Sequence, residues 1–214
     1  MSAFLGHIHY WLYHKIERVV EREELLYQAA AQNCGDTAEE LRQQVWQIYG
    51  QPLPANSDLG EHIDQRNIHG WLQRQIMLAE TREAAFIKEL CDACGGLAEG
   101  LVEETFRQHG ALCGQAAQQA GKHALDSAKS IYQALNDFFL NGMPCDEGDQ
   151  VAKESPELLS WTGVCHQERN WLRGGMDKER MQSWQQLWLE SFVAAANPAY
   201  QYQSVGSSQE IKRK

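Results

Sequence analysis

Two segments of the chain, sixty residues apart, carry the same short pattern. The pattern is Ile-His-x-Trp-Leu, which occurs at residues 8–12 and again at 68–72. The same offset pairs further identical residues: Ile16 with Ile76, Arg22 with Arg82 and Glu23 with Glu83. At about 100° per residue, the histidines and glutamates fall on the apolar stripe that each segment must bury if it is helical. The repeat therefore predicts two similar long helices with buried polar groups, which are costly without partners.

Apolar residues recur with helical periodicity along most of the chain. The expected long helices span residues 4–32, 38–49, 56–94, 97–140 and 177–196, with a short helix between 156 and 165. Alternation of period two is not apparent, and β-branched residues are few. We therefore expect an all-α fold, a bundle of long antiparallel helices on which a tryptophan-rich C-terminal helical tail packs.

The expected domain organisation follows from composition. Residues 1–140 form the bundle core, and 141–155, rich in Gly, Pro, Asp and Glu, form a linker loop. Residues 156–196, with four of the seven tryptophans, dock on the bundle, and 197–214 form a polar, frayed tail.

The net charge of −10 disfavours nucleic acid and anionic lipid as partners, because both carry negative charge. No apolar run approaches the ~20 residues of a bilayer span, and the start of the chain lacks the features of a secretory signal. Six cysteines without an export signal favour reduced thiols. These features predict a cytoplasmic protein that engages neither nucleic acid nor a membrane.

Three of the predicted long helices direct an imidazole or carboxylate at the interior. The candidate metal ligands are His9, His69, His109, Glu23, Glu80 and Glu83. Helical bundles build metal and haem sites from such inward side chains. Histidine with carboxylate suits iron, manganese or zinc, and paired histidines suit haem. The Glu-x-x-His spacing of ferritin-like di-iron bundles is absent, so the residues indicate no family.

The direction of the two repeated helices decides how these groups meet. If the helices run parallel, His9 faces His69, and Glu23 faces Glu80 and Glu83. If they run antiparallel, His9 meets Glu83 and Glu23 meets His69. In a simpler interpretation, each histidine is a core residue bonded to a carbonyl or carboxylate. Glu23 and Glu83 then lie at the margin of the stripe and pair with arginine at solvent.

A second candidate site lies in the tail. The segment from Trp161 to Trp171 collects Cys165, His166 and Arg169 between two indoles, and polar groups framed by aromatic walls are typical of small-molecule pockets. Cys91 and Cys94 form a lone Cys-x-x-Cys pair at a helix end, which favours small buried cysteines over a zinc or redox site.

The first functional hypothesis is therefore a helical bundle that binds a metal ion or metal-containing cofactor, with a redox role. One alternative is a non-catalytic interaction protein that forms a homo-oligomer, with buried histidines and glutamates paired to each other. Another is a small-molecule-binding protein that uses the Trp161–Trp171 segment. No nucleophile with an assigned base is recognisable by spacing, so the sequence does not specify a reaction.

Overall fold

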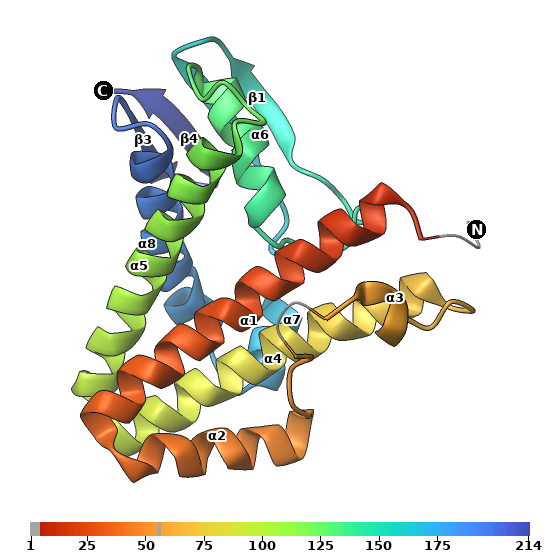
Figure 1. The fold of residues 1–214 in the computed structure, drawn as a ribbon. Helices are drawn as coiled ribbons and strands as arrows, with labels where there is room; N and C mark the ends of the chain where they lie inside the picture. Colours follow the sequence, from red (N-terminus) through yellow and green to blue (C-terminus); the bar gives the residue numbers. More distant parts are fainter. Residues whose placement is uncertain (1–4, 55–56) are drawn as a thin grey trace. The chain divides into compact units, whose positions relative to one another are not determined.

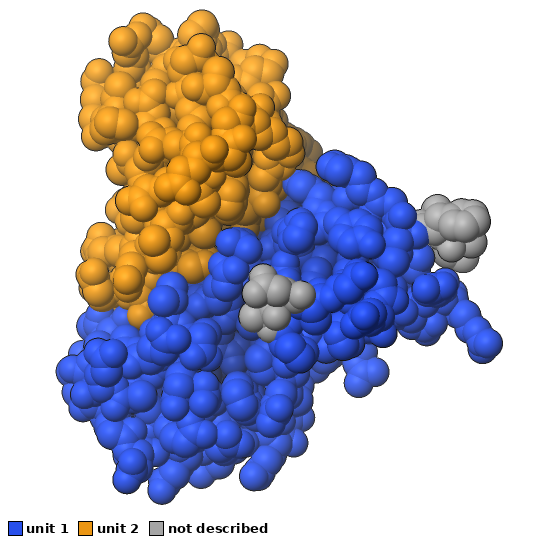
Figure 2. All heavy atoms as spheres, in the orientation of Figure 1, with its two compact units in different colours: residues 1–101, 140–144, 166–178 blue, residues 102–139, 145–165, 179–214 orange. Residues whose placement is uncertain are grey.

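The computed structural model describes residues 5–54 and 57–214, which form two compact units (Figures 1 and 2). The first unit contains the described residues up to 101, together with 140–144 and 166–178. The second contains 102–139, 145–165 and 179–214. The chain therefore passes between the units several times, and neither unit is a single continuous stretch of sequence.

The first unit is helical. Its elements are α1 (His7–Cys34), α2 (Asp36–Tyr49), α3 (Leu59–His62), α4 (Ile68–Cys94) and α7 (Glu168–Arg173). α1 packs against α2 and α4, and α4 also contacts α2 and α7. α1 buries Leu12, Ile16, Val19 and Leu26, whose spacing places them along one face of the helix.

The two repeated helices run parallel. Tyr13 contacts Trp71, Arg22 binds Glu83, and Tyr27 contacts Phe86, so residue numbers rise together along α1 and α4. Figure 1 shows these helices side by side, in red and yellow. The offset of about sixty residues in these contacts matches the sequence repeat. The two copies of the repeated pattern thus occupy equivalent positions in adjacent helices.

The equivalence continues to the ends of both helices. α1 ends at Cys34 and α4 at Cys94, and each is followed by a glycine and then directly by another helix. Gly35 has φ 60° and ψ −138°, and Gly95 has φ 56° and ψ −135°. A residue with a side chain rarely adopts this conformation, so the same glycine geometry separates two consecutive helices at both places.

The second unit combines helices with a sheet. It holds most of α5 (Gly96–Ala120), all of α6 (Ala128–Phe138) and nearly all of α8 (Lys178–Ala196). Its strands are β1 (Gln150–Glu154), β2 (Leu158–Thr162), β3 (Tyr200–Val205) and β4 (Ser208–Arg213). They form one antiparallel sheet in the order β1-β2-β4-β3.

One face of this sheet is covered by α6, which packs against β2 and β4. In the register of the sheet, Ile211 lies opposite both Leu159 and Tyr202, and all three are buried. The ring of Trp161 meets that of Tyr132 from α6, with centroids 4.8 Å apart. The core of the second unit therefore lies between this face and its helices.

The prediction of an all-α fold is wrong, because the four strands make this an α+β protein. Residues 197–214, expected to be a frayed polar tail, contain β3 and β4, and the expected linker 141–155 contains β1. The direction of the two repeated helices, for which the sequence allowed both possibilities, is parallel. The helix expected over 97–140 is two helices, because α5 ends at Ala120 and Gly121 follows with φ 60°.

Within the described residues, no helix is both long enough and apolar enough to cross a membrane.

Candidate functional site

The centre of the first unit holds two buried arginine–glutamate pairs that exchange partners between α1 and α4. Arg22 donates from Nε and Nη2 to the two carboxylate oxygens of Glu83, at 2.6 and 2.7 Å. Arg82 donates from Nε to both oxygens of Glu23, at 2.9 and 2.7 Å. Each helix thus supplies one arginine and one glutamate, and the four formal charges cancel.

These side chains are buried, so each charge needs a partner of opposite sign. Arg82, Glu23 and Glu83 are each less than 5% exposed. A charge at such depth is costly unless a partner of opposite sign lies against it. Burial raises the pKa of Glu23, and the Arg82 guanidinium opposes that shift. The Trp46 indole of α2 donates a third hydrogen bond to Glu23, at 3.4 Å.

A third carboxyl group, Glu80, lies one turn before Glu83 and has no basic partner bonded to it. It accepts a hydrogen bond from the Asn170 side chain of α7, at 2.7 Å. Its other oxygen, Oε1, is buried without a hydrogen-bond partner among the described residues. Burial raises the pKa of Glu80 to about 8, and the hydrogen bond from Asn170 only partly opposes this shift. Glu80 is therefore largely protonated at neutral pH.

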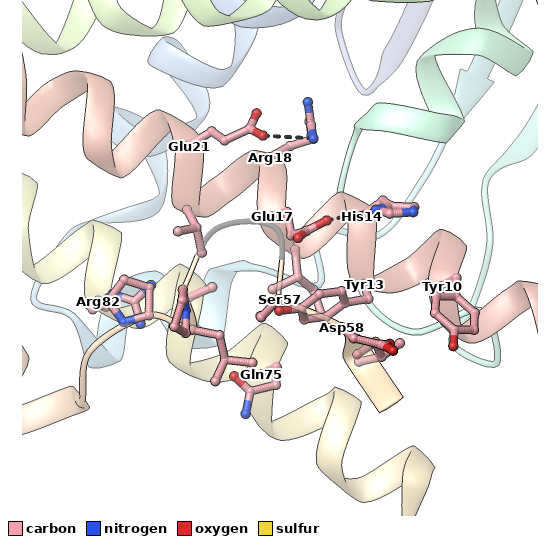
Figure 3. A pocket seen from close by; sticks show the side chains of 17 residues that line it. Tyr10, Tyr13, His14, Glu17, Arg18, Glu21, Ser57, Asp58, Gln75 and Arg82 are labelled. Carbon is pink, nitrogen blue, oxygen red and sulfur yellow. Dashed lines mark hydrogen bonds and ion pairs between the residues drawn. The ribbon is translucent and has the colours of Figure 1, made fainter. Parts of the chain in front are cut away.

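A pocket of about 450 Å³ opens in the same unit (Figure 3). Its walls come from α1, from α4 and from the segment around residues 52–59, of which residues 55–56 are outside the described part. The apolar part of the lining includes Ile16, Val20, Leu53 and Leu59. The volume falls within the ~300–1,000 Å³ typical of small-molecule sites.

Arg82 belongs to both the charge network and the pocket. In Figure 3 it lies at one end of the labelled side chains, and Tyr10 lies at the other. Its Nε is occupied by Glu23, whereas Nη2 is buried and has no hydrogen-bond partner among the described residues. A buried guanidinium nitrogen without an acceptor loses about 1–3 kcal/mol or more relative to a satisfied one. Arg82, one of the residues that line the pocket, therefore carries an unused hydrogen-bond donor.

The remaining charges of the pocket are mostly paired with each other. His14 lies 2.8 Å from Glu17, and Arg18 lies 2.8 Å from Glu21. Burial raises the pKa of Tyr13, so its hydroxyl keeps its proton at neutral pH. Asp58 accepts a hydrogen bond from the backbone of Gly60. The lining thus mixes apolar and polar side chains, and it carries three carboxylates (Glu17, Glu21 and Asp58) against two arginines (Arg18 and Arg82).

The structure does not bring the three predicted histidine ligands together. His9 lies in the first turn of α1, where Nδ1 accepts a hydrogen bond from the Gly6 backbone, and His69 is exposed in the first turn of α4. His109 is buried in the second unit, where Nδ1 accepts a hydrogen bond from the Trp188 indole at 2.8 Å. The two histidines of the repeat are therefore near the surface, and the third is a bonded core residue.

The three predicted glutamate ligands do lie together, but their oxygens face arginine and asparagine donors. Glu23 and Glu83 are bound by Arg82 and Arg22, and Glu80 is bound by Asn170. Among residues 5–54 and 57–214, no group of three or more His, Cys, Asp and Glu side chains could hold a metal ion. The metal and haem hypothesis stays a prediction, without a ligand set in the described residues.

The second candidate set divides between the units. Trp161 and Cys165 belong to the second unit, and His166, Arg169 and Trp171 belong to the first. Trp161 is buried against Tyr132, Trp171 is buried, and Arg169 is exposed. None of the five lines the pocket described above.

Sequence reasoning missed Arg82 and Asn170 as parts of a site. The signal for Arg82 was present, because Arg-Glu occurs at the same place in both copies of the repeat. When two helices pack in parallel with these positions side by side, the arginine of each helix can bind the glutamate of the other, as it does here. Asn170 had no comparable signal, because its contact with Glu80 spans 90 residues of sequence.

Comparisons of the chain with protein-family models, with curated proteins and with solved structures gave no match.

Proposed function

We propose that the first unit binds a small molecule in the pocket lined by α1, α4 and the segment around residues 52–59. In this proposal Arg82 donates a hydrogen bond from its guanidinium to an oxygen of the ligand. The observation that carries the proposal is the combination of a pocket of small-molecule size with a buried donor in its wall that has no described partner. A ligand oxygen placed there would satisfy Nη2 and offset its desolvation.

The charge distribution favours an uncharged ligand. Glu23 already neutralises Arg82, and the lining carries three carboxylates, Glu17, Glu21 and Asp58, against one further arginine, Arg18. A multiply charged anion such as a phosphate ester would meet these carboxylates, and like charges repel at short range. We therefore propose a ligand with an apolar or aromatic body and one carbonyl oxygen, such as a primary amide.

Ligand-observed NMR with a library of small aromatic compounds tests the proposal. The library contains matched sets, among them benzamide, benzoate and benzyl alcohol, so that the carbonyl and the charge are varied separately. We expect saturation transfer from the protein to be strongest for the amides. Benzoate should show less, because of the surrounding carboxylates, and benzyl alcohol should show least.

Two pairs of variants locate the binding. Arg82→Lys keeps the positive charge beside Glu23 and removes the guanidinium nitrogens, so it should weaken amide binding at least tenfold. Arg22→Lys makes the same change at the equivalent position of the repeat, outside the pocket lining, and should leave binding unchanged. Gln75→Trp should fill the pocket from its rim, whereas Gln73→Trp, on the exposed side of α4, should not.

Two outcomes would contradict the proposal. If Arg82→Lys and the unmodified protein bind the amides equally, Arg82 does not recognise the ligand. If no compound in the library loses its signal in the Gln75→Trp variant, the pocket is not a binding site for molecules of this class.

A further inference from the structure

We propose that Cys34 and Cys94 are an oxidisable thiol pair, and that they close to a disulfide by exchange with a small disulfide such as oxidised glutathione. The two cysteines are the last residues of α1 and α4. Both are unbridged and partly exposed. This modification site is independent of the pocket, because neither cysteine lines it.

The parallel packing of α1 and α4 places the two thiols together. Two turns before the helix ends, the ring of Tyr27 still contacts that of Phe86, at a centroid distance of 6.5 Å. The same offset of about sixty residues brings Cys34 to Cys94, and the two side chains form a hydrogen bond with each other. The matching glycine reversals after both cysteines hold the two helix ends in equivalent conformations.

The contact also affects the chemistry of the Cys34 thiol. Burial, together with the hydrogen bond to Cys94, raises the pKa of the Cys34 thiol to about 11. Because the thiolate is the attacking species, Cys34 must lose its proton before its sulfur can attack.

The reaction balances in two exchange steps. The Cys94 thiolate attacks one sulfur of oxidised glutathione, forms a mixed disulfide and releases one glutathione thiolate, which takes up a proton. Cys34 then gives its proton to water, and its thiolate attacks the Cys94 sulfur, breaking the mixed disulfide and releasing the second glutathione. Two protein thiols are oxidised, and one glutathione disulfide is reduced to two thiols.

The crosslink would join positions sixty residues apart in sequence. A disulfide that closes a loop of this length restricts the unfolded chain much more than the folded one. Oxidation should therefore raise the melting temperature, and reduction should reverse the change.

The experiment treats the reduced full chain with oxidised glutathione, blocks remaining thiols and digests it with trypsin without reduction. Mass spectrometry should find peptide 23–42 joined to peptide 89–107 with the loss of two hydrogens. The second peptide contains both Cys91 and Cys94, so the Cys91→Ser variant assigns the bond. This variant should form the crosslink as the unmodified chain does, and its melting temperature should rise by several degrees on oxidation.

The Cys34→Ser variant replaces a thiol by a hydroxyl of similar size that still donates a hydrogen bond. It should stop at the mixed disulfide on Cys94, with glutathione retained in peptide 89–107. Two results would overturn the proposal: a bond between Cys91 and Cys94 in place of the crosslink, or mixed disulfides alone in the unmodified chain.

Discussion

Arg82 of α4 holds Glu23 of α1 through a single nitrogen, Nε, which donates to both carboxylate oxygens at 2.9 and 2.7 Å. The equivalent arginine, Arg22, uses Nε and Nη2 for Glu83 instead, one oxygen each. The two copies of the repeat therefore carry the same arginine and glutamate but bind them with different hydrogen bonds. The difference leaves Nη2 of Arg82 without a described partner beside the pocket.

Removing one member of the Arg82–Glu23 pair should be more harmful than removing both. Glu23→Gln leaves an uncompensated buried guanidinium, and Arg82→Met leaves an uncompensated carboxylate. Each should lower the free energy of unfolding by about 3–5 kcal/mol. The double variant should lose much less than the sum, because no uncompensated charge remains, and urea unfolding of all four proteins measures the coupling.

An exposed ion pair provides the control for this double-mutant cycle of Arg82 and Glu23. Lys129 and Glu154 lie 2.7 Å apart with about half of each side chain exposed (52% and 47%). Replacing either should change the free energy of unfolding by less than about 1 kcal/mol. Additive losses in the Arg82–Glu23 cycle would mean that the two charges do not stabilise each other.

Glu80 should make the protein less stable as the pH rises. The pKa of Glu80 is about 8 in the folded protein, against a reference value of 4.5. Between pH 4.5 and pH 8, the folded state therefore keeps the proton on Glu80 while the unfolded state has lost it. The free energy of unfolding falls through this window and levels off above pH 8. Glu80→Gln removes the titration, so its stability relative to the unmodified protein should rise by about 2–3 kcal/mol between pH 6 and pH 9.

Thermal unfolding of both proteins across that range checks the prediction. Asn170→Ala serves as the comparison, because it removes the donor at 2.7 Å but leaves the carboxyl group buried and titratable. A constant stability difference between Glu80→Gln and the unmodified protein from pH 6 to pH 9 would show that Glu80 does not titrate there.

The long helices were predictable because each buries a stripe of apolar side chains over many turns. The expected segments 38–49 and 177–196 correspond closely to α2 (Asp36–Tyr49) and α8 (Lys178–Ala196). The burial of Glu23, Glu80, Glu83 and His109 was predicted by the same periodicity and is confirmed. His9 and His69 were misplaced because both lie in the first turn of their helices, before the helix reaches the core.

The sheet was missed because its strands are five or six residues long and the pairing that joins its two hairpins spans a large sequence distance. β2 pairs with β4, about fifty residues away, and such a contact leaves no local periodic signal. Two local signals did exist. Tyr200 and Tyr202 alternate with glutamines, and Gly206 and Ser207 form the two-residue loop expected of a β-hairpin.

Two glycines of α5 should respond in opposite ways to replacement by alanine. A Cβ at Gly110 would lie 2.3 Å from the backbone oxygen of Trp188, so Gly110→Ala must displace α8 and should cost about 1–3 kcal/mol. Gly100 is exposed, with nothing within 4 Å of the added atom. Gly100→Ala should therefore stabilise the helix by roughly 0.5–1 kcal/mol. Urea unfolding distinguishes the two, and stabilisation by both substitutions would contradict the close approach of α5 and α8.

The buried contact between His109 and Trp188 gives a prediction about hydrogen bonding in the second unit. Nδ1 of His109 is the acceptor for the indole N–H at 2.8 Å, and the two rings also touch, with centroids 6.2 Å apart. His109→Phe keeps an aromatic ring but leaves the indole N–H unsatisfied, so it should lower the free energy of unfolding by about 1–3 kcal/mol. His109→Gln offers a carbonyl oxygen to the same donor and should lose less.

Tryptophan fluorescence during urea unfolding measures these losses. In the indole ¹H–¹⁵N NMR spectrum, the Trp188 signal should shift upfield in His109→Phe, because its hydrogen bond is gone. His123→Phe is the matched control, since His123 lies near the surface beside Asp137 and should leave that signal in place. If His109→Phe and His109→Gln destabilise the protein equally and neither moves the signal, the histidine contributes packing alone, and the hydrogen bond to Trp188 has no part in holding α5 to α8.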